Sequence, residues 1–189
     1  MTTDYRWDFL DRPAEQLRHA VVAMLAAVHG PGPLVDIGAG PEHLYRWLAP
    51  TRTTRYIAVD QEPPPSSQAG GAIPIERILA NARNWTPPPV AIGALVASEV
   101  LGFIDAPGPV LERIAGAFES VGCVIVSMVV PRPDKPNWQR SATRVWTALA
   151  ATDWPLVDRV RVESASARLA WDIEVRRPTS EHPARGGRA

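Results

Sequence analysis

The sequence has few of the residues that mark several large classes of protein. Its 189 residues include one cysteine, Cys123, so no disulfide can form within the chain. No cluster of cysteine and histidine offers metal-ligand spacing, which argues against a metal site. No apolar run approaches the length of a membrane span, so we expect no membrane partner. The first ten residues lack the apolar core of a secretory signal, and we therefore expect a soluble, cytoplasmic protein.

Net charge is also absent, because 20 Lys and Arg balance 20 Asp and Glu. Domains that hold nucleic acid by its phosphates usually carry a basic excess. The balance therefore favours a small-molecule partner over nucleic acid. Proline, by contrast, is abundant at 20 residues, many of them in clusters. Proline breaks helices and interior strands, so the clusters mark loops that divide the chain.

Between these loops, apolar patterns predict helices alternating with strands. Strands are expected over 34–37, 56–60, 75–79, 92–98, 121–130, 156–163 and 168–176. Helices are expected over 12–29, from Pro41, over 110–118 and over 138–151. The first is capped by Asp11 and presents an apolar face of Leu17, Val21, Met24, Leu25 and Val28. The alternation predicts an α/β domain with a mainly parallel seven-stranded sheet and helices on both faces. The last two strands, joined by a short turn, form a C-terminal antiparallel hairpin.

One domain is expected over residues 1–177, because its length and apolar content suit a single core. Residues 178–189 contain Pro, Gly, Arg and Ala but no large apolar side chain, which predicts a disordered tail.

Residues suited to binding follow the first two predicted strands. Gly38 and Gly40 let the backbone turn tightly and approach a ligand closely. A helix beginning at Pro41 would present unpaired backbone N–H groups to that ligand. Asp60 ends the second strand, where a carboxylate can accept hydrogen bonds from ribose hydroxyls. Because ligands of open α/β sheets bind beyond the carboxyl ends of the strands, this pattern predicts a nucleotide-like ligand.

The spacing of the glycines selects among three such ligands. A nucleoside triphosphate loop needs Gly-x-x-x-x-Gly-Lys-Ser/Thr, which the sequence lacks. A dinucleotide loop needs Gly-x-Gly-x-x-Gly, and the bulky His43 stands at the place of the third glycine. The third ligand is S-adenosylmethionine (SAM).

The run Val35-Asp36-Ile37-Gly38-Ala39-Gly40 resembles the first motif of the class I SAM-dependent methyltransferases. The resemblance extends over residues 10–176, including the fourth strand, the turn after it and the closing antiparallel pair. It implies a Rossmann-like fold that transfers the methyl group of SAM to an O, N or C nucleophile of a small molecule. The cofactor-binding residues that it implies are Asp36, Gly38, Gly40, Asp60, Asn81, Ala82 and Ser98.

Three positions depart from the family's pattern. Glu42 stands where a third glycine is common, and its carboxylate would either reach the cofactor's amino group or repel its carboxylate. Gly93 replaces an acid that often precedes the fourth strand. Phe103 replaces a histidine that many small-molecule members carry after that strand.

Two side chains are candidates for catalysis. His43 could act as a general base, because an imidazole titrates near neutral pH. Glu99 lies at the mouth of the predicted site. Both also have a plainer interpretation, as residues of a helix surface and of an exposed loop. Three other functions stay open: a catalytically degenerate binding or scaffold protein, an oxidoreductase on the same fold, and an enzyme that uses only the cofactor's charge.

Overall fold

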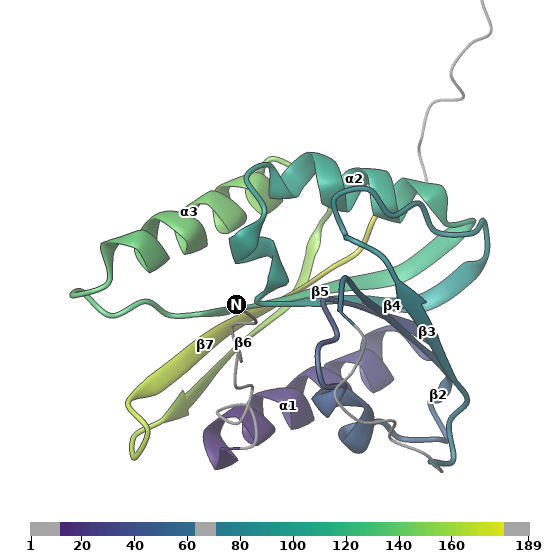
Figure 1. Ribbon diagram of the computed structural model, residues 1–189, viewed down its shortest axis with the longest axis horizontal. Helices are drawn as coiled ribbons and strands as arrows, with labels where there is room; N and C mark the ends of the chain where they lie inside the picture. Colours follow the sequence, from purple (N-terminus) through teal and green to yellow (C-terminus); the bar gives the residue numbers. More distant parts are fainter. Residues whose placement is uncertain (1–11, 63–70, 180–189) are drawn as a thin grey trace, which may run out of the picture.

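The computed structural model describes residues 12–62 and 71–179, and these form one sheet covered by helices on both faces (Figure 1). The strands are β1 (Gly32–Ile37), β2 (Thr53–Asp60), β3 (Ile75–Leu79), β4 (Ala91–Ser98), β5 (Ser120–Val129), β6 (Leu156–Ser164) and β7 (Leu169–Arg176). Each of the seven begins and ends within a few residues of its predicted range. The positions of the loops, predicted from proline and glycine, are therefore confirmed.

The sheet has the order β3-β2-β1-β4-β5-β7-β6. The neighbours from β3 through β5 are parallel, whereas β7 runs antiparallel to both β5 and β6. This arrangement confirms the mainly parallel, Rossmann-like sheet with a C-terminal antiparallel hairpin. The chain order reverses between β1 and β4, which lie side by side at the centre. In such sheets the reversal point is where ligands bind.

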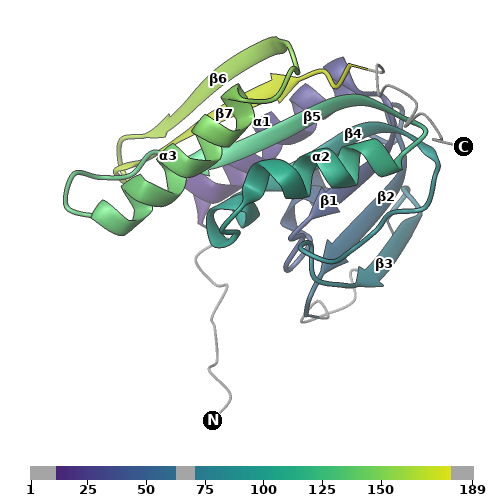
Figure 2. The same cartoon turned by 90° about the horizontal axis from the view of Figure 1, so that it is seen from above.

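Helices cover the two faces unequally. The helix α1 (Pro13–His29) lies on one face, and α2 (Pro107–Ala117) and α3 (Pro136–Ala150) lie on the other (Figures 1 and 2). Because both faces are covered, β4 and β5 are buried along most of their length and read as continuous apolar runs. Cys123, within β5, is completely buried, and burial raises the pKa of its thiol to about 12. The prediction of a buried strand thiol is confirmed.

The expected helix at Pro41 is wrong. The chain turns through residues 40–42 and then forms only a five-residue 3-10 helix, η2 (His43–Trp47). The cause is Glu42, which has a left-handed backbone (φ 61°) and therefore cannot continue an α-helix from Pro41. The glycine loop therefore leads into a short 3-10 helix rather than into the N-terminus of an α-helix.

The apolar face predicted for α1 is wrong at three of its five residues. Leu17, Met24 and Val28 are 47%, 53% and 65% exposed, whereas Leu25 is buried and Val21 packs partly against the core. The buried residues of α1 are Ala14, Glu15, Arg18, His19, Val22, Ala23, Leu25 and Ala26. The helical spacing of apolar residues favoured the face with the larger side chains, whereas the helix buries mainly smaller side chains together with three ionisable ones. The helix N-cap is Arg12, and the predicted cap, Asp11, lies outside the described residues.

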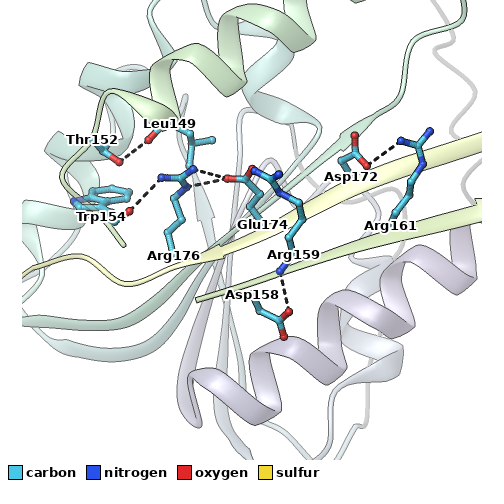
Figure 3. A network of polar contacts seen from close by, with 9 residues as sticks. All are labelled: Leu149, Thr152, Trp154, Asp158, Arg159, Arg161, Asp172, Glu174 and Arg176. Carbon is cyan, nitrogen blue, oxygen red and sulfur yellow. Dashed lines mark hydrogen bonds and ion pairs between the residues drawn. The ribbon is translucent and has the colours of Figure 1, made fainter. Parts of the chain in front are cut away.

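A polar network fastens the C-terminal hairpin to the end of α3 (Figure 3). Glu174 on β7 is 5% exposed and forms ion pairs with Arg176, at 2.7 Å, and with Arg159 of β6. Arg176 also donates a hydrogen bond to the backbone oxygen of Trp154, at 3.1 Å. The network fixes β7 in the sheet, and with it Trp171, a side chain that contacts the site described below.

Two further expectations concern membrane spans and the C-terminal tail. Within the described ranges, no helix is long and apolar enough to cross a membrane. Of the predicted tail, residues 180–189 lie outside those ranges.

Candidate functional site

The predicted binding residues come together where the central strands end. Register pairs Ile37 of β1 with Val59 of β2 and with Ala97 of β4, so the three strands end almost level. Asp60 of β2 pairs in turn with Leu79 of β3. The segments that follow these strands therefore surround one region at the carboxyl edge of the sheet.

The glycine loop, residues 38–42, leaves β1 in a conformation that favours glycine. Gly38 has φ 71° and donates a backbone hydrogen bond to the oxygen of Val59, at 2.8 Å. A Cβ atom added at Gly38 would lie 2.5 Å from Cγ2 of Val100, in the turn after β4. Gly38 is thus required both by its left-handed backbone and by the close approach of two loops.

Gly40 and Asp60 face each other across the loop. The N–H of Gly40 donates to Oδ2 of Asp60 at 2.8 Å, and the N–H of Glu62 donates to Oδ1 at 3.0 Å. Gly40 has φ 50°, but an added Cβ atom would find no atom of residues 12–62 or 71–179 within 4 Å. The glycine loop therefore borders open space, and the carboxylate of Asp60 lies directly beside it.

Asn81 and Ala82 follow β3 at the same edge. The N–H of Ala80 donates to the backbone oxygen of Asp60, at 2.8 Å, which places this segment next to the glycine loop. The amide of Asn81 donates to Oε1 of Gln61 at 3.0 Å and accepts from the N–H of Arg83 at 2.9 Å. Asn81 thereby links the ends of β2 and β3.

The first half of α1 supplies a third side of the site, which sequence reasoning missed. Arg18 is 2% exposed and donates to Oε2 of Glu15 from Nε, at 3.1 Å, and from Nη2, at 3.0 Å. Its Cζ lies 5.9 Å from the ring centre of Trp171, a cation–π contact. Glu15, Arg18 and His19 share one face at spacings of three and four residues. A pattern of apolar residues does not detect such a polar face.

Glu99 lies where β4 ends, with a left-handed backbone (φ 62°). Its Oε1 accepts a hydrogen bond from Nε1 of Trp171 at 2.7 Å. Burial raises the pKa of Glu99, although the charge of Arg18 opposes this. Glu99 is therefore not the exposed loop acid of the plainer interpretation, but a mostly buried carboxyl held between β7 and α1.

The structure buries His43, the other catalytic candidate. Its side chain is 4% exposed, and its ring centre lies 5.8 Å from that of His19. Burial, together with the charges of Arg18 and His43, lowers the pKa of His19 to about 2. The interpretation of His43 as a helix-surface residue is wrong, because it packs beneath α1.

Several polar atoms in this region are buried without a hydrogen-bond partner among the described residues. They include Nη1 of Arg18, Oγ of Ser98 and Oγ of Ser127. Ser98 and Ser127 are register partners on β4 and β5. Unsatisfied buried polar groups are uncommon in folded proteins, and each calls for an explanation such as an ordered water, an ion or a catalytic role.

Asp36, near the end of β1, is 4% exposed and accepts a hydrogen bond from the hydroxyl of Tyr56 at 2.7 Å. Burial raises its pKa from 3.8 to about 7; the nearby carboxylates of Asp60 and Glu42 add to the rise. The hydrogen bond from Tyr56 and the charge of Arg18 act in the opposite direction. The fold thus keeps a proton on Asp36 that the unfolded chain releases.

This linkage predicts a pH dependence of stability. Between pH 4 and 7 the folded state binds the extra proton, so its free energy of unfolding falls as pH rises, by at most about 1.4 kcal/mol per unit. Asp36→Asn cannot ionise but can still accept from Tyr56. We expect the variant to gain stability over the wild type between pH 5 and pH 8, measured by urea unfolding. An equal difference between the two proteins at both pH values would contradict this.

Comparisons with known proteins extend this picture. No family model and no curated protein matches the sequence. Among solved structures, the N-methyltransferase NodS from Bradyrhizobium japonicum WM9 matches with a TM-score of 0.70 and 18% identity, over 90% of this chain and 99% of that chain. A 1,6-didemethyltoxoflavin-N1-methyltransferase from Burkholderia thailandensis matches with 0.67 and 17%, over 92% and 82%. The chain has the class I SAM-dependent methyltransferase fold.

This methyltransferase fold is not confined to methyl transfer. The [4+2]-cyclase SpnF matches with a TM-score of 0.64 and 15% identity, over 87% of this chain and 81% of that chain. Because all these identities lie below 25%, the likeness concerns architecture alone. The function has to be argued from the site itself.

Proposed function

We propose that the chain transfers the methyl group of SAM to a small-molecule acceptor. The observation that carries the proposal is the glycine loop, in which Gly40 donates its N–H to Asp60 and an added Cβ atom would meet no described atom within 4 Å. A ligand lying in that space would meet backbone rather than side chains at the loop, and a carboxylate at its rim. The SAM-type ligand bound by the matched NodS and toxoflavin enzymes supports this choice.

The residues around the loop suit the parts of this cofactor. Asp60 would accept hydrogen bonds from the ribose hydroxyls, and the segment of Asn81 and Ala82 would border the adenine. Asp36 and Ser98 would hold the methionyl end beneath Gly38. The unpartnered Nη1 of Arg18 and Oγ of Ser98 offer that end polar contacts that the protein leaves unmade.

When bound, SAM supplies an electrophilic sulfonium methyl group, which in-line attack by an O, N or C nucleophile transfers, leaving S-adenosylhomocysteine (SAH). The protein's task is mainly alignment of the two reactants. Where the acceptor must lose a proton, Glu99 is the group that we assign to receive it, since its pKa is raised and it lies at the end of β4. His43 is too deeply buried beneath α1 for this role.

A second candidate is a catalytically degenerate binding protein. Phe103, which stands in place of the family's histidine, is 71% exposed and supports this alternative. Gly93 does not, because a Cβ atom there would lie 2.3 Å from the backbone oxygen of Gly30. Close packing of two backbones therefore explains the loss of the acid at position 93 without any reference to catalysis.

The proposal predicts that SAH binds to the wild type and that Asp60→Ala weakens binding about tenfold or more, because hydrogen bonds to a charged group are lost. Calorimetric titration measures both. Asp158→Ala is the matched control, since Asp158 pairs with His29 at the far end of α1, and it should bind SAH normally.

Turnover is tested by incubating the protein with SAM and a panel of small amines, phenols and carboxylates, and measuring SAH by mass spectrometry. No heat on titration of the wild type with SAH, or unchanged binding in Asp60→Ala, would contradict the proposed site. SAH binding without turnover across the panel would favour the binding protein. Binding of NADH instead of SAH would favour the oxidoreductase.

A further inference from the structure

Glu42 has a backbone and an environment that are both unfavourable for glutamate. Its φ of 61° is left-handed, which is costly for a residue with a Cβ atom. Its side chain is 1% exposed, so a carboxylate is buried at the end of the glycine loop. Strain and a buried charge persist together only where the surrounding structure compensates for them.

The compensation comes from Arg77 on β3. Nε of Arg77 donates to Oε1 of Glu42 at 2.6 Å, and Nη2 donates to Oε2 at 2.8 Å. Two parallel hydrogen bonds of this kind fix the orientation of both side chains. The carboxylate of Glu42 is therefore paired with a guanidinium group of this chain. It points across β2, where Ala58 is the register partner of Arg77, to the outer strand of the sheet.

The ion pair adds a side-chain anchor at the end of a loop whose beginning is held by backbone hydrogen bonds of Gly38 and Ala39 to Val59. The glycine loop continues into the short η2 rather than into a long helix. The described residues between β2 and β3, 61–62 and 71–74, also contain no helix that could pack beside it. We propose that the Glu42–Arg77 ion pair is a positioning device for the glycine loop, which it holds open for the cofactor. The inference rests on the proposed function.

The same two strands offer a matched control. Arg55 of β2 and Glu76 of β3 also form an ion pair, but their side chains are 52% and 39% exposed. Arg55→Met removes a pair of the same chemistry between β2 and β3 without touching the glycine loop. A pair whose only role is to join the strands would behave like this control.

The test compares Arg77→Met, Arg77→Lys and Arg55→Met with the wild type. Hydrogen–deuterium exchange of the backbone amides in residues 36–48, without ligand, reports on the loop, and calorimetry gives the affinity for SAH. We expect Arg77→Met to speed exchange and to weaken SAH binding at least tenfold. Arg77→Lys keeps the charge but cannot form the two parallel hydrogen bonds, so its exchange and affinity should lie between those of Arg77→Met and the wild type. Arg55→Met should match the wild type in both.

The double variant Glu42→Gln with Arg77→Met separates positioning from stability, because it leaves no uncompensated charge. We expect it to regain thermal stability but not the affinity for SAH. The inference would be overturned if Arg77→Met showed the amide exchange and the SAH affinity of the wild type. It would also be overturned if the double variant regained its SAH affinity together with its thermal stability. If the wild type does not bind SAH, the proposed function is wrong. The positioning role is then still tested by hydrogen–deuterium exchange, because unchanged exchange of the loop amides in Arg77→Met would contradict it.

Discussion

Gly40→Leu is expected to abolish measurable SAH binding while leaving the protein folded. An added Cβ atom at Gly40 meets no atom of the described residues within 4 Å, so the surrounding backbone does not bar a side chain there. The space beside Gly40 is also where the proposed cofactor lies, so the new side chain would exclude it. We expect a loss of affinity of at least 100-fold, measured by calorimetric titration with SAH.

Gly40→Ala is the matched control for the backbone. Both substitutions impose the cost of a left-handed residue (φ 50°), about 1–2 kcal/mol, but alanine adds a single carbon. The two variants should therefore unfold at similar temperatures and differ mainly in affinity. If leucine and alanine weakened SAH binding equally, the open space would not be the cofactor site.

Gly38→Ala should destabilise the protein far more than Gly40→Ala does. Both glycines are left-handed, but only at Gly38 would the Cβ atom collide with Val100, 2.5 Å away. Strain and overpacking together should lower the free energy of unfolding by about 2–4 kcal/mol. Urea unfolding of the two alanine variants measures the difference directly.

Val100→Ala provides the rescue. The colliding atoms are Cγ2 of Val100, at 2.5 Å, and its Cβ, at 2.6 Å; alanine removes the first and keeps the second, so it should restore only part of the stability lost in Gly38→Ala. The coupling between the two substitutions is then obtained from a double-mutant cycle. Additive effects would show that the collision is not the cause of the instability, and equal losses in Gly38→Ala and Gly40→Ala would show that it costs little.

The sheet could be predicted from the sequence because its signals are local. Strands such as 92–98 and 121–130 are nearly continuous apolar runs, with prolines at 87–89 before the first and Pro131 after the second. The short turn near Ser164 requires the last two strands to be antiparallel. The positions of Gly38, Gly40 and Asp60 at the carboxyl edge followed from the strand ends. Once the strands were placed, the binding edge was placed as well.

The polar side of the site could not be predicted, because it depends on contacts between distant segments. Arg18 and Glu99 are 81 positions apart, and the rotation of α1 that buries Arg18 is set by packing against the sheet rather than by its own pattern. Glu42, in its left-handed turn, is likewise paired with Arg77, 35 residues later. In both places an ionisable group is buried against local preference, which is the usual mark of a functional or strained site.

A crystal structure of the protein grown with SAH would show whether the glycine loop and Asp60 form the cofactor site. We expect the adenosine to lie against the backbone of Gly40, with both ribose hydroxyls within hydrogen-bond distance of the carboxylate of Asp60. A structure in which SAH lies elsewhere, or in which the space beside Gly40 stays empty at saturating SAH, would contradict this expectation.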